Sequence, residues 1–230
     1  MQFLCLNIKR FLLPPAVLFF SCGLSFSQPL KVINNYREYK DLAATDSLQK
    51  MIEVKMAIPS ITYDLRYVTK ANFTGEKLYK EGNKTFLRLP VATALRAAAK
   101  ELAAQGYTLK IWDAYRPYSA TKKMWSLIHD DRYVADPARG SGHNRGLAVD
   151  LTLMKGEEEV DMGTGFDNFS DSAHHDFTKL PETVLHNRLL LRSTMEKYGF
   201  KALQTEWWHY SFPNDGRYDV LDIDLKKLAY

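Results

Sequence analysis

Hydrophobic patterning divides the chain into a mixture of helices and strands. An Ala-rich run that begins after Pro90 and stops at Gly106 has helical spacing, and proline is favoured in the first turn of a helix as glycine is at its end. Two further helices are predicted over 117–129 and 181–198. The first of them again starts at a proline, and Gly199 ends the second.

Four segments have the pattern of strands. Apolar and polar residues alternate over 61–68, and short apolar runs occupy 107–112, 146–154 and 206–212. The polar, weakly patterned segment 30–53 is expected to be an arm packed on the domain. Because helices and strands mix without a regular β-α-β rhythm, the sequence predicts one α+β domain with a mainly antiparallel central sheet and flanking helices.

The first residues have the order of a bacterial export signal. Lys9 and Arg10 precede an apolar run over 11–20, and small residues follow it. The run is too short for a stable membrane span, and two prolines within it disfavour a core helix. We therefore expect an export signal over 1–27, a mature domain over 28–230, and an exported, periplasmic protein.

Charge and cysteine content narrow the function classes. The formal net charge is only +4, two of those charges lie in the leader, and the basic residues form no stripe, so no nucleic-acid partner is expected. The two cysteines, Cys5 and Cys22, also lie in the leader, so a metal in the mature domain would need histidines and carboxylates. Cys22 resembles a lipoprotein cleavage site that lacks the usual leucine, which leaves a lipid anchor as the alternative to removal.

A carboxylate, Asp150, interrupts the apolar strand predicted over 146–154. A buried carboxylate is costly unless it is paired, hydrogen-bonded or bound to a metal. His143 precedes it beyond a glycine-containing turn, so loop and strand can bring the imidazole beside the carboxylate. The structural alternatives are a buried salt bridge from Asp150 to Arg145, or a loop histidine at position 143 that faces solvent.

A second cluster places Glu206 shortly before His209, with Trp207 and Trp208 between them. Two tryptophans would exclude water and strengthen electrostatic interactions. A regular strand would point Glu206 and His209 to opposite faces, so both reach one site only if the strand bulges or bends. The alternative is an edge strand whose glutamate and histidine face water.

Together, His143, Asp150 and His209 have the composition of a catalytic zinc site, in which three protein ligands leave the fourth position to water. Glu206 then remains free to act as a base. Arg116 falls at a junction between strand and helix, where a fixed guanidinium could stabilise oxyanion charge. An arginine before a proline at a helix start is more often structural.

The other four histidines are not expected to bind the metal. His129 and His186 fall on helix surfaces by periodicity. His174 and His175 are adjacent in a polar loop, so their side chains diverge, and they would at most lie near the substrate.

In their order and spacing, these motifs resemble the D-alanyl-D-alanine dipeptidase family, the VanX-like branch of the zinc D,D-peptidases. The resemblance extends from about Ile61 to Phe212. Its segments are Tyr63–Tyr67, Asn72–Gly75, Tyr115–Pro117, Ser141–Asp150, Asp161–Thr164, Phe166–Asp167, Ser172 with His174–His175, and Glu206–His209.

The resemblance implies an enzyme that hydrolyses the dipeptide D-Ala-D-Ala to two D-alanine molecules. It implies one zinc ion on His143, Asp150 and His209. Glu206 would be the general acid and base, and Arg116 would stabilise the tetrahedral intermediate.

The family's substrate contacts fall on Ser141, near the dipeptide carboxylate, and on Asp167, near its free ammonium. An acidic group facing a free amine favours a dipeptidase over an enzyme that trims long peptides. Two departures from the family pattern, Gly142 and Asn144, are expected to loosen the loop that positions Ser141. The leader is a further departure, because well-known members act in the cytoplasm.

Two other functions compete with this interpretation. The nearer is a zinc D,D-carboxypeptidase or endopeptidase that acts on longer peptidoglycan peptides. The other is a non-catalytic, zinc-dependent protein that binds cell-wall peptides, which is disfavoured because such a binder would have no need of Glu206.

Overall fold

The computed structural model describes residues 29–79 and 82–229. The predicted export signal and Cys22 lie outside these residues. Across the described ranges, no helix combines the length and the apolar character that crossing a membrane requires.

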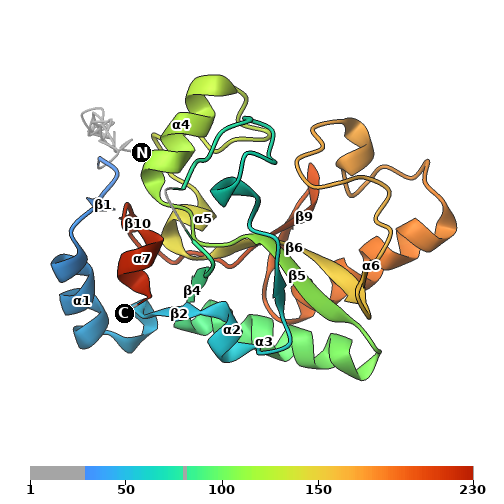
Figure 1. Cartoon of the computed structure of the whole chain (residues 1–230), viewed down its shortest axis with the longest axis horizontal. Coiled ribbons are helices and arrows are strands. Elements are labelled where there is room, and N and C mark those ends of the chain that lie inside the picture. Colours follow the sequence, from blue (N-terminus) through green and yellow to red (C-terminus); the bar gives the residue numbers. More distant parts are fainter. Residues whose placement is uncertain (1–28, 80–81, 230) are drawn as a thin grey trace, which may run out of the picture.

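A six-stranded sheet forms the centre of the molecule (Figure 1). Its strands are β3 (Thr62–Tyr63), β5 (Thr108–Asp113), β6 (Ala148–Lys155), β7 (Glu158–Glu159), β8 (Lys201–Leu203) and β9 (Glu206–Ser211). The order is β3-β5-β6-β9-β8, with β7 paired to β6. β3 runs parallel to β5 and the other pairs are antiparallel. The predicted α+β domain is confirmed, with a mixed rather than purely antiparallel sheet.

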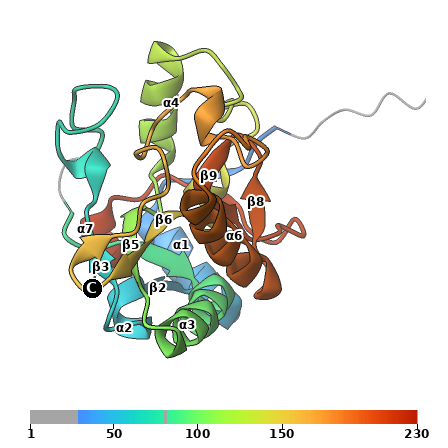
Figure 2. The same cartoon turned by 90° about the vertical axis from the view of Figure 1, so that its right-hand side faces the viewer.

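Two long helices, α3 (Leu89–Ala104) and α6 (Glu182–Lys197), lie next to each other and pack against the sheet (Figure 2). Both contribute to one large apolar core, which also contains Val149, Leu151 and Leu153 of β6. Because successive side chains of a strand point to opposite faces, Asp150 faces away from these three residues. The polar residue that interrupts the apolar pattern therefore lies on the other face of the sheet.

Most of the predicted elements are present. The three predicted helices correspond to α3, α4 (Tyr118–Leu127) and α6, and the apolar strands correspond to β5, β6 and β9. Shorter elements fill the gaps between them. They are β4 (Phe86–Arg88), α2 (Val54–Ala57), α5 (Gly142–Arg145), β10 (Val220–Leu221), α7 (Leu225–Leu228) and the 3₁₀ turns η1 (Ser47–Gln49), η2 (Arg66–Val68) and η3 (Asp171–Ala173).

The strand predicted over 61–68 is wrong beyond its first residues. Pairing in β3 covers only Thr62 and Tyr63, and the chain then turns into η2. The turn directs Tyr67 inward, where it is 3% exposed within a second apolar cluster. Burial of this large ring takes the place of continued strand pairing.

The arm predicted over 30–53 packs on the domain but is more regular than its sequence indicates. It contains β1 (Val32–Ile33), α1 (Tyr36–Thr45) and β2 (Met51–Glu53). The pattern is weak because α1 buries few side chains against the second apolar cluster.

Candidate metal centre and active site

Three neighbouring strands align the polar groups of the site. Asp150 of β6 lies directly opposite His209 of β9, and Asp113 of β5 lies opposite Asp150. The second pairing follows a register shift between Ile111 and Asp113, so β5 bulges at Trp112. Because residues directly opposite in a sheet share a face, the three side chains form a row across the strands.

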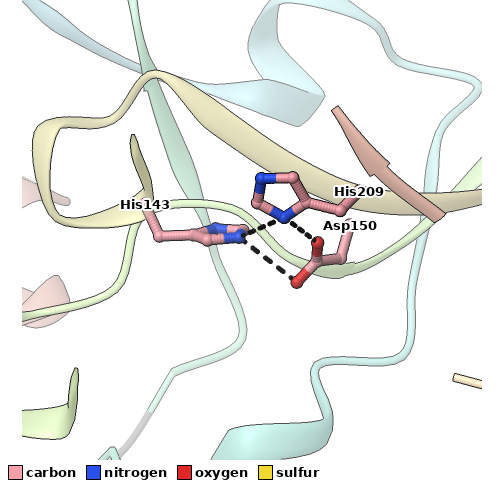
Figure 3. A group of neighbouring side chains, drawn as sticks. All are labelled: His143, Asp150 and His209. Atoms are coloured by element: carbon pink, nitrogen blue, oxygen red, sulfur yellow. Dashed lines mark hydrogen bonds and ion pairs between the residues drawn. The ribbon is translucent and has the colours of Figure 1, made fainter. Parts of the chain in front are cut away.

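His143 joins this row from the short helix α5. Its Nδ1 lies 2.7 Å from the Ala114 carbonyl oxygen, which can only accept, so Nδ1 carries the proton. In the neutral ring Nε2 then carries the lone pair, and this nitrogen points toward Asp150 and His209 (Figure 3). Nε2 is 3.3 Å from Asp150 Oδ2 and 3.2 Å from His209 Nδ1, and His209 Nδ1 is 2.9 Å from Asp150 Oδ1.

These three donor atoms fit a divalent metal ion. Among the described residues, one group could hold a metal ion, formed by His143, Asp150 and His209. One ligand atom from each of these residues lies within 4.8 Å of the other two. Ligand atoms around a tetrahedral zinc lie about 3.3 Å apart, given metal–ligand bonds of about 2.0 to 2.1 Å. The observed separations match that spacing, and two imidazoles with one carboxylate suit zinc.

The electrostatics of the cluster also favour metal binding. Burial alone would raise the pKa of Asp150, but His143 and His209 outweigh burial and hold this pKa below its usual range. Burial lowers the pKa of His209, with Asp150 opposing the effect, so its imidazole is kept neutral. An ionised carboxylate and a neutral imidazole are the forms that bind metal.

Glu206 lies beside the cluster because β9 bulges. Leu203 of β8 pairs with Glu206, whereas the preceding Ala202 pairs with Tyr210, so the residues between leave the regular register. Glu206 Oε2 comes within 3.9 Å of His209 Nδ1. The predicted bulge is confirmed, and the edge-strand alternative is wrong because β9 lies between β6 and β8.

The Glu206 carboxyl group is in a strongly desolvated position. Its residue is 6% exposed. Burial raises the pKa of Glu206 well above its usual value, and the negative charges of Asp150 and Asp167 raise it further. A carboxyl group with a raised pKa can both take up and release a proton near neutral pH.

Arg116 is held rigidly at the edge of the cluster. Its Nε and Nη2 donate to Asp113 Oδ2 over 2.9 and 2.8 Å, and Nη2 lies 3.7 Å from Asp150 Oδ2. The guanidinium also lies 5.0 Å from the centre of the Tyr67 ring. Burial opposes the charge, but Asp113 raises the pKa of Arg116 and keeps it ionised.

Asp113 is a site residue that the sequence analysis missed. It is 1% exposed, accepts a hydrogen bond from Tyr79 over 2.6 Å, and has Oδ2 3.5 Å from His143 Nδ1. It therefore orients both Arg116 and a candidate ligand. The sequence does contain a signal for Asp113 that resembles the one for Asp150. Asp113 is an acidic residue at the end of an apolar strand, whereas Asp150 interrupts one.

Asp167 occupies a conformation that few residues adopt. Its φ is +60°, in the left-handed region, which aspartate tolerates better than most residues. Tyr67 donates to Oδ1 over 2.9 Å, and the buried Oδ2 has no hydrogen-bond partner. Burial raises the pKa of Asp167 to about 7, although the Tyr67 hydroxyl opposes this shift.

Ser141 is fixed as the N-cap of α5. Its Oγ accepts from the Asn144 backbone N–H over 3.1 Å, and Asn144 Oδ1 accepts from the Ser141 N–H over 2.9 Å. Asn144 is fully buried and donates to the carbonyl of Arg116 and the hydroxyl of Thr121 over 2.9 and 2.8 Å. The expectation that Asn144 loosens the loop is wrong, because it ties the loop to its surroundings.

Gly142 likewise reflects tight packing. A Cβ atom at this position would lie 2.9 Å from the Cβ of Ala148. Real Cβ atoms essentially never come so close, so glycine lets α5 approach β6. The expectation that Gly142 loosens the loop is therefore also wrong.

The salt bridge considered between Asp150 and Arg145 is absent from the described contacts of both residues. Arg145 instead donates to the carbonyl oxygens of Ser141 and Arg139 over 3.0 and 2.8 Å. Asp150 instead contacts His143, His209 and Arg116.

The remaining histidines lie outside the cluster, as expected. His129 and His186 are exposed; His186 lies on α6 as predicted, whereas His129 follows the end of α4 instead of lying on a helix. His174 and His175 follow η3, and neither belongs to the wall of the cavity described next.

One cavity of about 350 Å³ contains all seven predicted site residues in its wall. They are Arg116, Ser141, His143, Asp150, Asp167, Glu206 and His209. The three candidate ligands and the proposed substrate contacts therefore open onto the same space.

The chain matches known proteins over most of its length. A family model described as "D-ala-D-ala dipeptidase" matches residues 47–225. The D-alanyl-D-alanine dipeptidase of Escherichia coli is 34% identical over 173 residues, 75% of this chain and 89% of that protein. The D-alanyl-D-alanine dipeptidase of Enterococcus faecalis is 34% identical over 171 residues, 65% of this chain and 85% of that protein.

A solved structure described as "VanYB in complex with D-Alanine-D-Alanine" overlaps with a TM-score of 0.39 at 15% identity, covering 58% of this chain and 75% of that chain. This overlap is too low to add to the assignment made from the sequences.

The family match and the three-donor cluster in one cavity together support a metallopeptidase. The chain belongs to the D-alanyl-D-alanine dipeptidase family. The family resemblance drawn from the motifs is thereby confirmed.

Proposed function

We propose that this protein is a zinc-dependent dipeptidase that hydrolyses D-Ala-D-Ala to two D-alanine molecules. The observation that carries the proposal is the convergence of His143, Asp150 and His209 beside the buried carboxyl group of Glu206, in the cavity of a chain that belongs to this family. Three protein ligands leave a fourth position free for water, as in catalytic zinc sites.

His143, Asp150 and His209 would hold one zinc ion, through Nε2, a carboxylate oxygen and Nδ1. When bound, the ion would polarise the peptide carbonyl and lower the pKa of a coordinated water. Asp113 and the Ala114 carbonyl would keep the His143 ring in the required tautomer and orientation.

Glu206 would move the proton. Its raised pKa suits a base that accepts a proton from the attacking water and then delivers it to the departing amine. Its carboxyl group lies 3.9 Å from His209 Nδ1, which supports a position beside the metal ion. One buried carboxyl group would thus serve both proton transfers.

Arg116 would stabilise the negative charge that develops on the carbonyl oxygen. Its contacts with Asp113 and Tyr67 fix the guanidinium before substrate arrives, so little reorganisation is needed.

Two residues of the cavity wall, Asp167 and Ser141, support a free dipeptide as the substrate. The unpartnered Oδ2 of Asp167 would accept the substrate ammonium, and Ser141 would lie near the substrate carboxylate. An acylated amine has no charge and would leave Asp167 without its partner. The substrate would therefore be D-Ala-D-Ala itself rather than the end of a longer peptide.

The test compares kcat/KM for D-Ala-D-Ala and for its N-acetyl form. A charge-assisted pair in a partly buried site is worth about 2 to 3 kcal/mol, so the free dipeptide should be favoured by roughly 30- to 150-fold. Equal or faster hydrolysis of the acetylated peptide would reject the dipeptidase and favour the D,D-carboxypeptidase. Zinc retained without hydrolysis of either peptide would favour the binding protein.

We further propose export through the leader over 1–27, with a role in recovering D-alanine from cell-wall fragments outside the cytoplasm. The basic, apolar and small-residue order of the leader supports export. Mass spectrometry of the mature protein should find Gln28 at the N-terminus, or a lipidated Cys22. An intact leader on protein from the cytoplasmic fraction would contradict export and leave the chemistry unaffected.

A further inference from the structure

A buried arginine that has no part in the proposed chemistry gathers the two ends of one loop. Arg188 of α6 is 4% exposed. Its Nε donates to the carbonyl of Met162 over 2.8 Å, Nη2 to that of Ser172 over 2.9 Å, and Nη1 to that of His174 over 3.2 Å. Because Met162 precedes the loop 163–171 and the other two residues follow it, a single guanidinium closes the base of this loop.

The loop carries Asp167 in an unfavourable state. Its φ of +60° and its buried oxygen without a partner both cost free energy locally, and such features persist where the surroundings enforce them. Phe166 provides one restraint by stacking on Trp112 at 5.0 Å. Thr164 provides another, since its hydroxyl accepts from the Trp207 indole over 2.8 Å.

The contacts of Arg188 use the shape of the guanidinium. Its donors lie in one plane at fixed angles, so three carbonyl oxygens bonded to it are held at fixed relative positions. Lysine would provide a compact charge on a flexible stem and could not reproduce this fork. The guanidinium also lies 5.8 Å from the ring centre of Trp207, the residue after Glu206.

We propose that Arg188 is a positioning residue that sets the preference for a free amino group. By closing the base of the loop 163–171, it holds Asp167 in the wall of the cavity that the candidate metal ligands also line. This inference rests on the proposed dipeptidase function, because it assigns Arg188 an effect on the substrate ammonium through Asp167.

The test compares Arg188→Lys with Arg192→Lys, a matched control one turn along α6, where the half-buried arginine pairs with Glu196. Both are assayed on D-Ala-D-Ala and its N-acetyl form, well below their melting temperatures. Arg188→Lys should lower kcat/KM for the free dipeptide by about 10- to 100-fold, mainly through KM, because small displacements of a positioning group have effects of this size. The acetylated peptide and the zinc content should change little, and Arg192→Lys should match the unmodified enzyme.

A double variant separates positioning from a general structural role. In an Asp167→Asn background, Arg188→Lys should have little further effect on the free dipeptide, because the two substitutions remove the same interaction. The proposal would be overturned if Arg188→Lys lowered activity equally on both peptides, and did so in the unmodified protein as well as in the Asp167→Asn background.

A readout without substrate distinguishes this proposal from the proposed function. Chymotrypsin should cut after Phe166 or Phe169 faster in Arg188→Lys than in Arg192→Lys, because the loop opens at its base. If the unmodified enzyme fails to hydrolyse D-Ala-D-Ala, the dipeptidase is rejected. Faster cutting of Arg188→Lys by chymotrypsin would still show that Arg188 closes the base of the loop. Equal cutting rates for Arg188→Lys and Arg192→Lys would overturn the role proposed for Arg188, even if the enzyme is an active dipeptidase.

Discussion

Asp113 and Asp150 lie directly opposite each other on β5 and β6, so two buried carboxylates share one face of the sheet. Two like charges on directly opposing residues would repel each other strongly in a desolvated site. Arg116 lies between them, with Nη2 2.8 Å from Asp113 and 3.7 Å from Asp150. His143 also contacts both carboxylates, with Nδ1 3.5 Å from Asp113 Oδ2 and Nε2 3.3 Å from Asp150 Oδ2. The arrangement of the two carboxylates therefore depends on Arg116 and His143 together.

Asp113→Asn should release Arg116. The amide removes the negative charge that fixes the guanidinium, and breaking a buried ion pair costs about 3 to 5 kcal/mol. We expect a lower melting temperature and a fall in kcat, measured by calorimetry and steady-state kinetics. Asp219→Asn is the matched control, because its pair with Lys31 is exposed and worth at most about 1 kcal/mol. Equal effects of the two substitutions would argue against a special role for Asp113.

The double variant His143→Ala, His209→Ala should lose the metal. The purified protein should contain about one zinc per chain, and removing two of three ligands should leave very little. Elemental analysis of both proteins measures this directly. The double variant His129→Ala, His186→Ala is the control, since both side chains are exposed, and it should keep its zinc. Undiminished zinc after loss of His143 and His209 would reject the ligand assignment.

Glu206→Gln should keep the metal and the fold yet lose most turnover. The amide has nearly the same shape but cannot accept or deliver the proton, and a general acid–base group contributes about 10²- to 10⁴-fold. The measurement is kcat on D-Ala-D-Ala together with zinc content. A rate near that of the unmodified enzyme would show that another group is the base.

Asp167 should make stability depend on pH. The unfolded carboxyl group has a pKa near its usual value of about 3.9, and burial raises the folded pKa to about 7. The folded state therefore binds the proton more tightly, and the contribution of Asp167 to the free energy of unfolding falls as pH rises from about 4 to about 7.

The Asp167→Asn variant has no carboxyl group to titrate at this position and so lacks this loss. Its free energy of unfolding, minus that of the unmodified protein, should therefore increase between about pH 4 and pH 7 by up to about 4 kcal/mol. The amide oxygen can still accept from Tyr67. Chelator-treated protein is the right material for these denaturant titrations, because a bound cation would lower the carboxyl pKa. A difference in stability that is constant between pH 4 and 8 would contradict the raised pKa.

The sequence predicts the long elements and the site residues because each leaves a local signal. Pro90 and Gly106 mark the ends of α3 closely, and Asp150 is conspicuous in an apolar strand. Residues whose role depends on a distant partner leave none. Arg188 resembles any surface arginine of a helix until the loop ends that it binds are folded against it.

Tyr67 illustrates the same limit in the fold. The alternation around it favours a strand, yet the ring turns inward to contact Phe166 and donates to Asp167, one hundred positions away in the chain. Asn144 is similarly expected from the sequence to loosen its loop, but its side chain bonds to Ser141, Arg116 and Thr121. In both cases tertiary contacts outweigh local preference.

The row formed by β5, β6 and β9 has a consequence for biosynthesis. The three candidate metal ligands lie far apart in the chain, and His209 of β9 is made well after His143 and Asp150. A ribosome-bound chain that stops short of β9 cannot assemble the trio, and such long-range pairings form late because loop closure must come first. Metal binding would therefore have to wait until β9 has been made and paired with β6, and products truncated before β9 would be unable to bind a metal ion at this site.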